Sequence, residues 1–79
     1  MIFTSNLYEA KSKDVLQVTA IPDISLLENL GIRVGTELCI LNRYQLGGPV
    51  LLRVESAYSV ALGKDIAVQI SVREVAGHE

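Results

Sequence analysis

The sequence predicts a mainly β protein, a small and partly closed antiparallel barrel with one short α-helix between its first two strands. Three observations support this fold class. Several short segments alternate apolar with polar residues, as strands with one buried face do. Turn-forming residues such as Pro22 and Gly47-Gly48-Pro49 separate these segments. A single short segment has its apolar residues at helical spacing. At 79 residues, the chain is expected to form one domain over 1–79, with flexible ends at 1–6 and 76–79.

The first strand is predicted at Val15–Ile21, which is rich in β-branched residues. Pro22 ends it, because proline cannot donate a hydrogen bond to a sheet ladder. The segment before this strand is weakly patterned. Within it, Leu7 and Tyr8 are the residues that we expect to anchor the chain on the core.

A short helix is predicted directly after Pro22. Ser25 and Glu28 have the spacing of a capping box, in which both side chains accept hydrogen bonds from free backbone N–H groups. Gly31 stands where a left-handed C-terminal cap is expected. The helix carries an apolar stripe made of Leu26, Leu27 and Leu30. Because consecutive helical residues point about 100° apart, one of the first two leucines is expected to stay partly exposed.

A β-hairpin follows the helix. Val34-Gly35 is typical of a type II turn, and residues 36–45 and Val50–Ala57 are predicted strands on either side of the turn at 46–49. In the first of these strands one face is expected to hold Leu38, Ile40, Asn42 and Tyr44, and the other Glu37, Cys39, Leu41 and Arg43.

The last part of the chain is read as a connection and a final strand. Tyr58–Lys64 is predicted to be a turn or a single helical turn that crosses one end of the barrel. Ile66–Val72 has the most regular alternation in the sequence and is predicted to be a strand.

Composition excludes several classes of protein. A net charge of −2 and a pI near 5.3 argue against a nucleic-acid binder. The single cysteine cannot form an internal disulfide. The longest uninterrupted apolar stretch, Leu38–Leu41, is far shorter than the ~18 residues that a spanning helix needs, and the N-terminus lacks the pattern of a signal peptide. We therefore expect a soluble, cytoplasmic protein without direct membrane insertion.

The sequence offers no chemistry-bearing cluster. Cys39 and His78 have no second soft ligand near them, so no metal site, no cofactor and no catalytic residue are predicted. Gly47-Gly48-Pro49 lacks the Lys and Ser or Thr of a phosphate-binding loop, which leaves a hairpin turn as its interpretation.

The spacing of several short motifs resembles the FeoA family. The motifs are Leu-x-x-Leu-Gly-Ile-x-x-Gly at Leu27–Gly35, Leu46-Gly47-Gly48-Pro49, Ala61-Leu62, and Ala67-x-x-Ile70-x-Val72. They cover roughly the last two-thirds of the chain. One departure is Ser56-Ala57, where family members often carry Arg-Gly.

The resemblance implies an SH3-like barrel and a non-enzymatic partner of the membrane transporter FeoB in ferrous-iron uptake, engaging its cytoplasmic GTPase portion. A related module forms the C-terminal domain of DtxR-type repressors. The resemblance therefore leaves a second possibility, an SH3-like accessory domain that acts on a metal-dependent transcriptional repressor.

We expect the partner surface to be partly apolar and to include Leu27, Glu28, Leu46 and Pro49, around the helix and the hairpin turn. Tyr44 and Tyr58 are interpreted as packing residues at the ends of the barrel. A role as a weakly self-associating unit is a further alternative.

Overall fold

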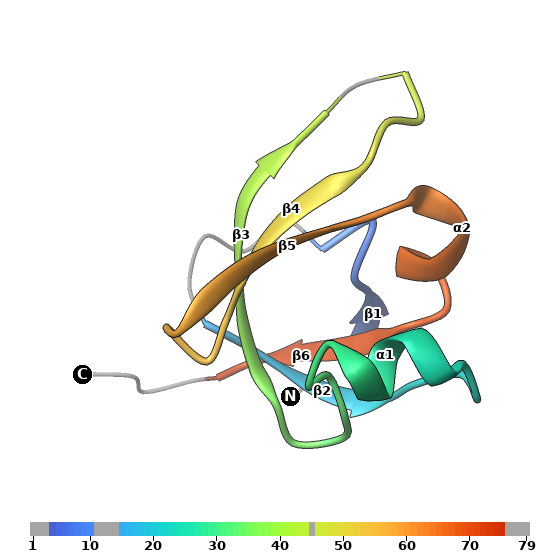
Figure 1. Ribbon diagram of the computed structural model, residues 1–79. Coiled ribbons are helices and arrows are strands. Elements are labelled where there is room, and N and C mark those ends of the chain that lie inside the picture. The colour runs from blue at the N-terminus through green and yellow to red at the C-terminus, as the bar shows by residue number, and fades with distance from the viewer. Residues whose placement is uncertain (1–3, 11–14, 45, 76–79) are drawn as a thin grey trace.

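A computed structural model describes residues 4–10, 15–44 and 46–75. In these residues the chain forms a single antiparallel sheet that curves around an apolar core, with two short helices beside it (Figure 1). The elements are β1 (Thr4–Asn6), β2 (Leu16–Ala20), α1 (Ser25–Asn29), β3 (Glu37–Arg43), β4 (Val50–Val54), β5 (Tyr58–Leu62), α2 (Lys64–Ala67) and β6 (Ser71–Glu74). The predicted fold class, a mainly β barrel-like protein, is confirmed.

The strand order is β1-β6-β2-β3-β4-β5, which makes β1 and β5 the two edges of the described sheet. The helix α1 was expected after the first strand, and it follows the second. The difference is β1, a strand whose weak sequence pattern did not predict it. Thr4–Asn6 belong to the N-terminal segment that we expected to be flexible, and they pair with β6. The expectation for 76–79 lies outside the described residues.

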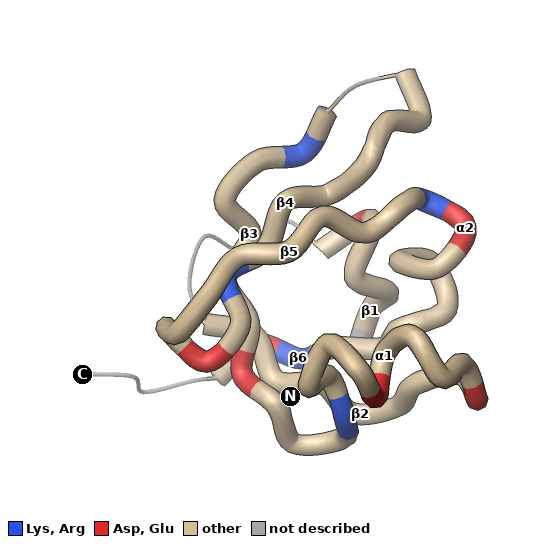
Figure 2. The backbone as a smooth tube through the Cα atoms, in the orientation of Figure 1, with Lys and Arg blue, Asp and Glu red and all other residues tan. Residues whose placement is uncertain are grey.

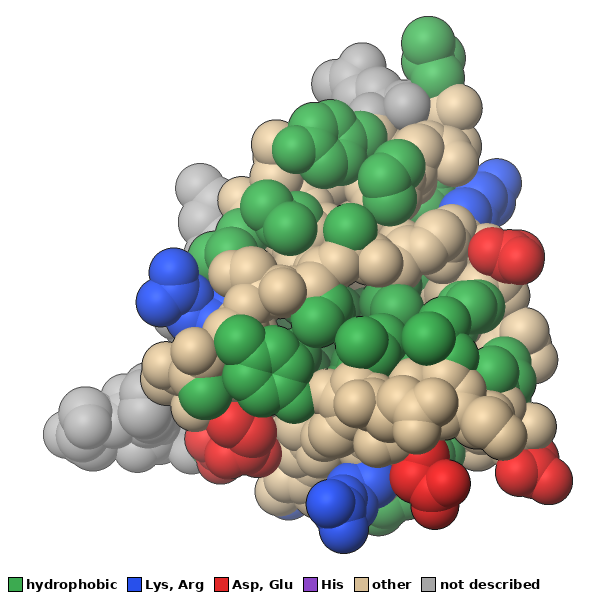
Figure 3. Space-filling view, viewed as in Figure 1, with side chains coloured by type: hydrophobic (Ala, Val, Ile, Leu, Met, Phe, Trp, Pro, Cys, Tyr) green, Lys and Arg blue, Asp and Glu red, His purple; other side chains and the backbone are tan. Residues whose placement is uncertain are grey.

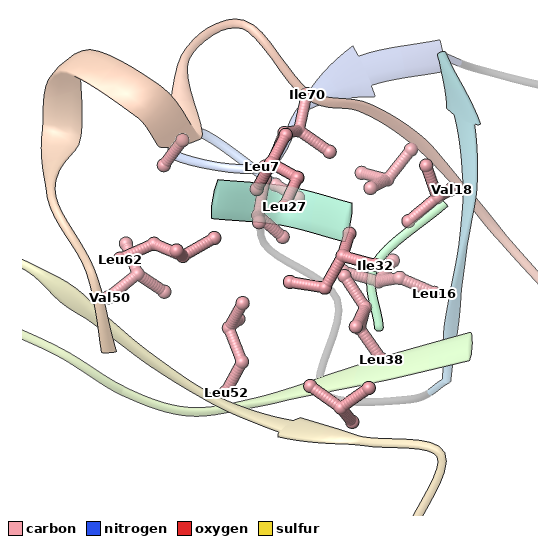
Figure 4. Close-up of a cluster of buried hydrophobic side chains, with 14 residues drawn as sticks. Leu7, Leu16, Val18, Leu27, Ile32, Leu38, Val50, Leu52, Leu62 and Ile70 are labelled. Carbon is pink, nitrogen blue, oxygen red and sulfur yellow. The ribbon is translucent and has the colours of Figure 1, made fainter. Parts of the chain in front are cut away.

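The core is a cluster of buried apolar side chains drawn from both helices and from most strands (Figure 4). Burial alternates along β2 and β4, as their sequence pattern predicts. Leu7 is fully buried and Tyr8 packs against the cluster, so both predicted anchors are confirmed. Neither described helix is long and apolar enough to cross a membrane.

The helix α1 ends as predicted but begins differently. Gly31 has φ +78°, its N–H bonds to the carbonyl of Glu28, and the N–H of Ile32 bonds to the carbonyl of Leu27. These two bonds form a Schellman motif with the usual apolar contact between its ends. The predicted capping box is wrong, because the N-cap is Ile24 and no side chain caps the helix. Ser25 is already helical, one residue too late to act as the cap.

A β-bulge divides β3. The register pairs Ile40 with Leu52 and Asn42 with Leu51, so Leu41 is the extra residue. The alternation reverses after the bulge, and our assignment of Asn42 and Tyr44 to the inner face is wrong.

The inner position falls instead to Arg43, which pairs with buried Val50. The Nη2 of Arg43 donates a hydrogen bond to the carbonyl of Ala10. This bond ties the hairpin to the segment that follows β1.

The connection and the last strand also differ from the prediction. Tyr58–Lys64, expected to be a turn or a single helical turn, contains β5 instead, because Glu55 and Ser56 both adopt positive φ and reverse the chain sharply before it. The predicted strand Ile66–Val72 begins as part of α2 and becomes β6 only at Ser71. Ala67 and Ile70 are both buried at helical spacing, so the apparent alternation was misleading.

Candidate protein-interaction surface

The described residues contain no group of three or more His, Cys, Asp and Glu placed to hold a metal ion. Cys39 is a free, half-buried thiol on β3. His78 lies outside the described residues. The features that stand out are exposed apolar side chains, and they gather in two places.

The structure does not bring the four predicted contact residues together. Leu27 and Glu28 are on α1, whereas Leu46 and Pro49 are in the turn between β3 and β4. In Figure 1, α1 lies at the bottom of the view and this turn at the top, so the two groups belong to different surfaces. Glu28, Leu46 and Pro49 are exposed, but Leu27 is fully buried.

One of the two leucines at the start of α1 is partly exposed, as expected. It is Leu26, whereas Leu27 was the one that we placed in the partner surface. Leu26 is 44% exposed, while Leu27 extends into the core cluster and has no exposed surface (Figure 4). Leu30, which ends the helix, is half-buried against the same cluster. Leu26 is therefore the residue of this pair that a partner can touch, whereas Leu27 belongs to the core.

The first apolar surface is the hairpin tip, which we define as Tyr44, Leu46 and Pro49. The side chain of Leu46 is completely exposed, and Tyr44 is 47% exposed. Leu46 and Gly47 have φ of +61° and +79°, and the N–H of Tyr44 bonds to the carbonyl of Pro49 at 3.1 Å. The turn thus holds a leucine away from the rest of the molecule, in a backbone conformation that favours glycine.

The second apolar surface is the β5–α1 face, which we define as Leu26, Leu30, Tyr58 and Val60. The hydroxyl of Tyr58 donates a hydrogen bond to the carbonyl of Leu30 and so links β5 to the end of α1. Leu26 and Leu30 are four residues apart on the helix and face the same way. Figure 3 shows hydrophobic side chains forming a band between β5 and α1.

Charged residues surround these surfaces rather than form one patch. Figure 2 shows acidic and basic positions distributed over several elements. Glu28 lines a surface hollow of about 360 Å³ beside α1, together with Ile21, Asp23, Ile24, Ser25, Ile32 and Arg33. The hollow mixes carboxylates, a guanidinium and apolar walls. Leu26 and Tyr58 were not among the four residues that we selected for the partner surface: the sequence placed Leu26 in the apolar stripe of the helix and Tyr58 among the packing residues, yet both are 44% exposed.

Comparison with known proteins identifies the protein family and the fold. A family model described as "FeoA domain" matches residues 5–74. No curated protein matches the chain.

Among solved structures, a manganese-dependent transcriptional repressor is 24% identical with a TM-score of 0.82, and the match covers 95% of this chain but 44% of the repressor. An iron uptake regulatory protein (FeoA) is 24% identical with a TM-score of 0.80, covering 92% of this chain and 99% of that one. A FeoA-like protein from Clostridium acetobutylicum is 30% identical with a TM-score of 0.78, covering 100% of this chain and 95% of that one. The SH3-like architecture implied by the resemblance is confirmed, and this chain spans less than half of the repressor's length.

Proposed function

The chain belongs to the FeoA family, and from this membership we propose that it is a non-enzymatic protein-interaction module that regulates ferrous-iron uptake by docking on a FeoB-type transporter. The partner region is the transporter's cytoplasmic GTPase portion, which places the protein in the cytoplasm. Docking would bias the nucleotide state or the assembly of the transporter, without chemistry performed by this chain.

The observation that carries this proposal is the hairpin tip. The side chain of Leu46 is completely exposed, so it does not pack in the core of the described structure. Its left-handed backbone costs roughly 1 kcal/mol relative to glycine at the same place. Leucine at this position therefore exposes a large apolar side chain and also lowers the stability of the fold. Its presence is best explained if the side chain is buried against a partner. Tyr44 and Pro49 in the same turn region are also exposed and add apolar surface.

The test is a titration of this protein with the soluble cytoplasmic part of the FeoB encoded in the same genome, followed by NMR. We expect amide shifts at the hairpin tip and a loss of binding in Leu46→Asn. Asparagine tolerates positive φ, so this variant removes the apolar side chain without weakening the fold. Val34→Asn is the matched control, because Val34 is 62% exposed in a turn beside α1. Unchanged binding by Leu46→Asn would refute the role of the tip.

A second candidate function is action on a metal-dependent transcriptional repressor. It is favoured by the similarity to a manganese-dependent repressor, in which a domain of this fold occupies 44% of the chain. The same titration with a repressor that lacks its own SH3-like domain separates the two functions. Binding to the repressor and not to the transporter would favour the second.

A further inference from the structure

We draw no further inference here: the strongest candidate, the edge of β5 beside the exposed apolar side chains of Leu26 and Tyr58, has both carboxylates and basic residues around it, so nothing in the structure shows what covers it.

Discussion

Substituting Gly31 with alanine should destabilise the fold through two separable effects. The backbone of Gly31 is left-handed, with φ +78°, and this conformation costs a non-glycine residue roughly 1–2 kcal/mol. A Cβ at this position would also overlap the hydroxyl of Tyr58, which donates its hydrogen bond to the carbonyl of Leu30. Displacing the hydroxyl forfeits this bond, worth roughly 0.5–1.5 kcal/mol. We therefore expect Gly31→Ala to lower the free energy of unfolding by about 2–3 kcal/mol.

This loss is large for a domain of this size, whose total stability is roughly 4–12 kcal/mol. The assay is urea denaturation of the wild type, Gly31→Ala, Tyr58→Phe and the double variant. Phenylalanine keeps the ring and removes the hydroxyl that the new Cβ would meet. In the Tyr58→Phe background, Gly31→Ala should cost only the backbone contribution, so the double variant should be about 1 kcal/mol more stable than the sum of the single losses predicts. Equal costs of Gly31→Ala in both backgrounds would refute the contact between the end of α1 and β5.

Three further predictions concern stability, and denaturation measures each of them. Ser56→Gly should stabilise the protein by about 0.5–1 kcal/mol, because Ser56 has φ +60°; Ala57→Gly, at a position without positive φ, should not, and stabilisation by both would contradict the reasoning. Leu27→Ala should cost about 2–5 kcal/mol, since Leu27 is fully buried, whereas Leu26→Ala should cost less than about 1 kcal/mol; comparable losses would place both leucines in the core. Thr36→Val should lower the free energy of unfolding by about 1–3 kcal/mol. The buried Thr36 hydroxyl accepts a hydrogen bond from the N–H of Arg33 at 3.0 Å and donates one to the carbonyl of Gly31 at 3.4 Å, so a neutral effect would contradict the role of this hydroxyl.

Local signals in the sequence were sufficient wherever a single residue type imposes a conformation. Gly31 and Gly35 both adopt the positive φ that was predicted for them, because only glycine enters this region at little cost. The strand β2 was predicted from its β-branched residues, and β4 and the hairpin from alternation, since β4 has one buried face. These features depend on neighbouring residues alone.

The errors arose where a tertiary contact decides the structure. The bulge at Leu41 changes which residues of β3 face inward, and no residue near it signals the extra position. The segment 66–70 has apolar residues at spacings that suit a strand, yet Ile66 and Ala67 belong to α2 and a turn follows, which buries both Ala67 and Ile70 against the core. The short strand β1 is explained by its pairing with β6, which follows about 65 residues later in the chain.

The candidate surface shows the same division between local and tertiary information. Exposure of Glu28, Leu46 and Pro49 was predictable, because they lie at a helix surface and in a turn. The choice between Leu26 and Leu27 was not, because it depends on the angle at which the chain enters α1 from an uncapped, extended Ile24. The edge of β5 could not be recognised either, since its existence requires the sharp turn at Glu55 and Ser56, two residues that rarely adopt positive φ. Non-glycine residues held in this conformation therefore mark two places that local sequence could not predict: Leu46 at the proposed docking surface of the hairpin tip, and Glu55 and Ser56 in the turn that creates β5.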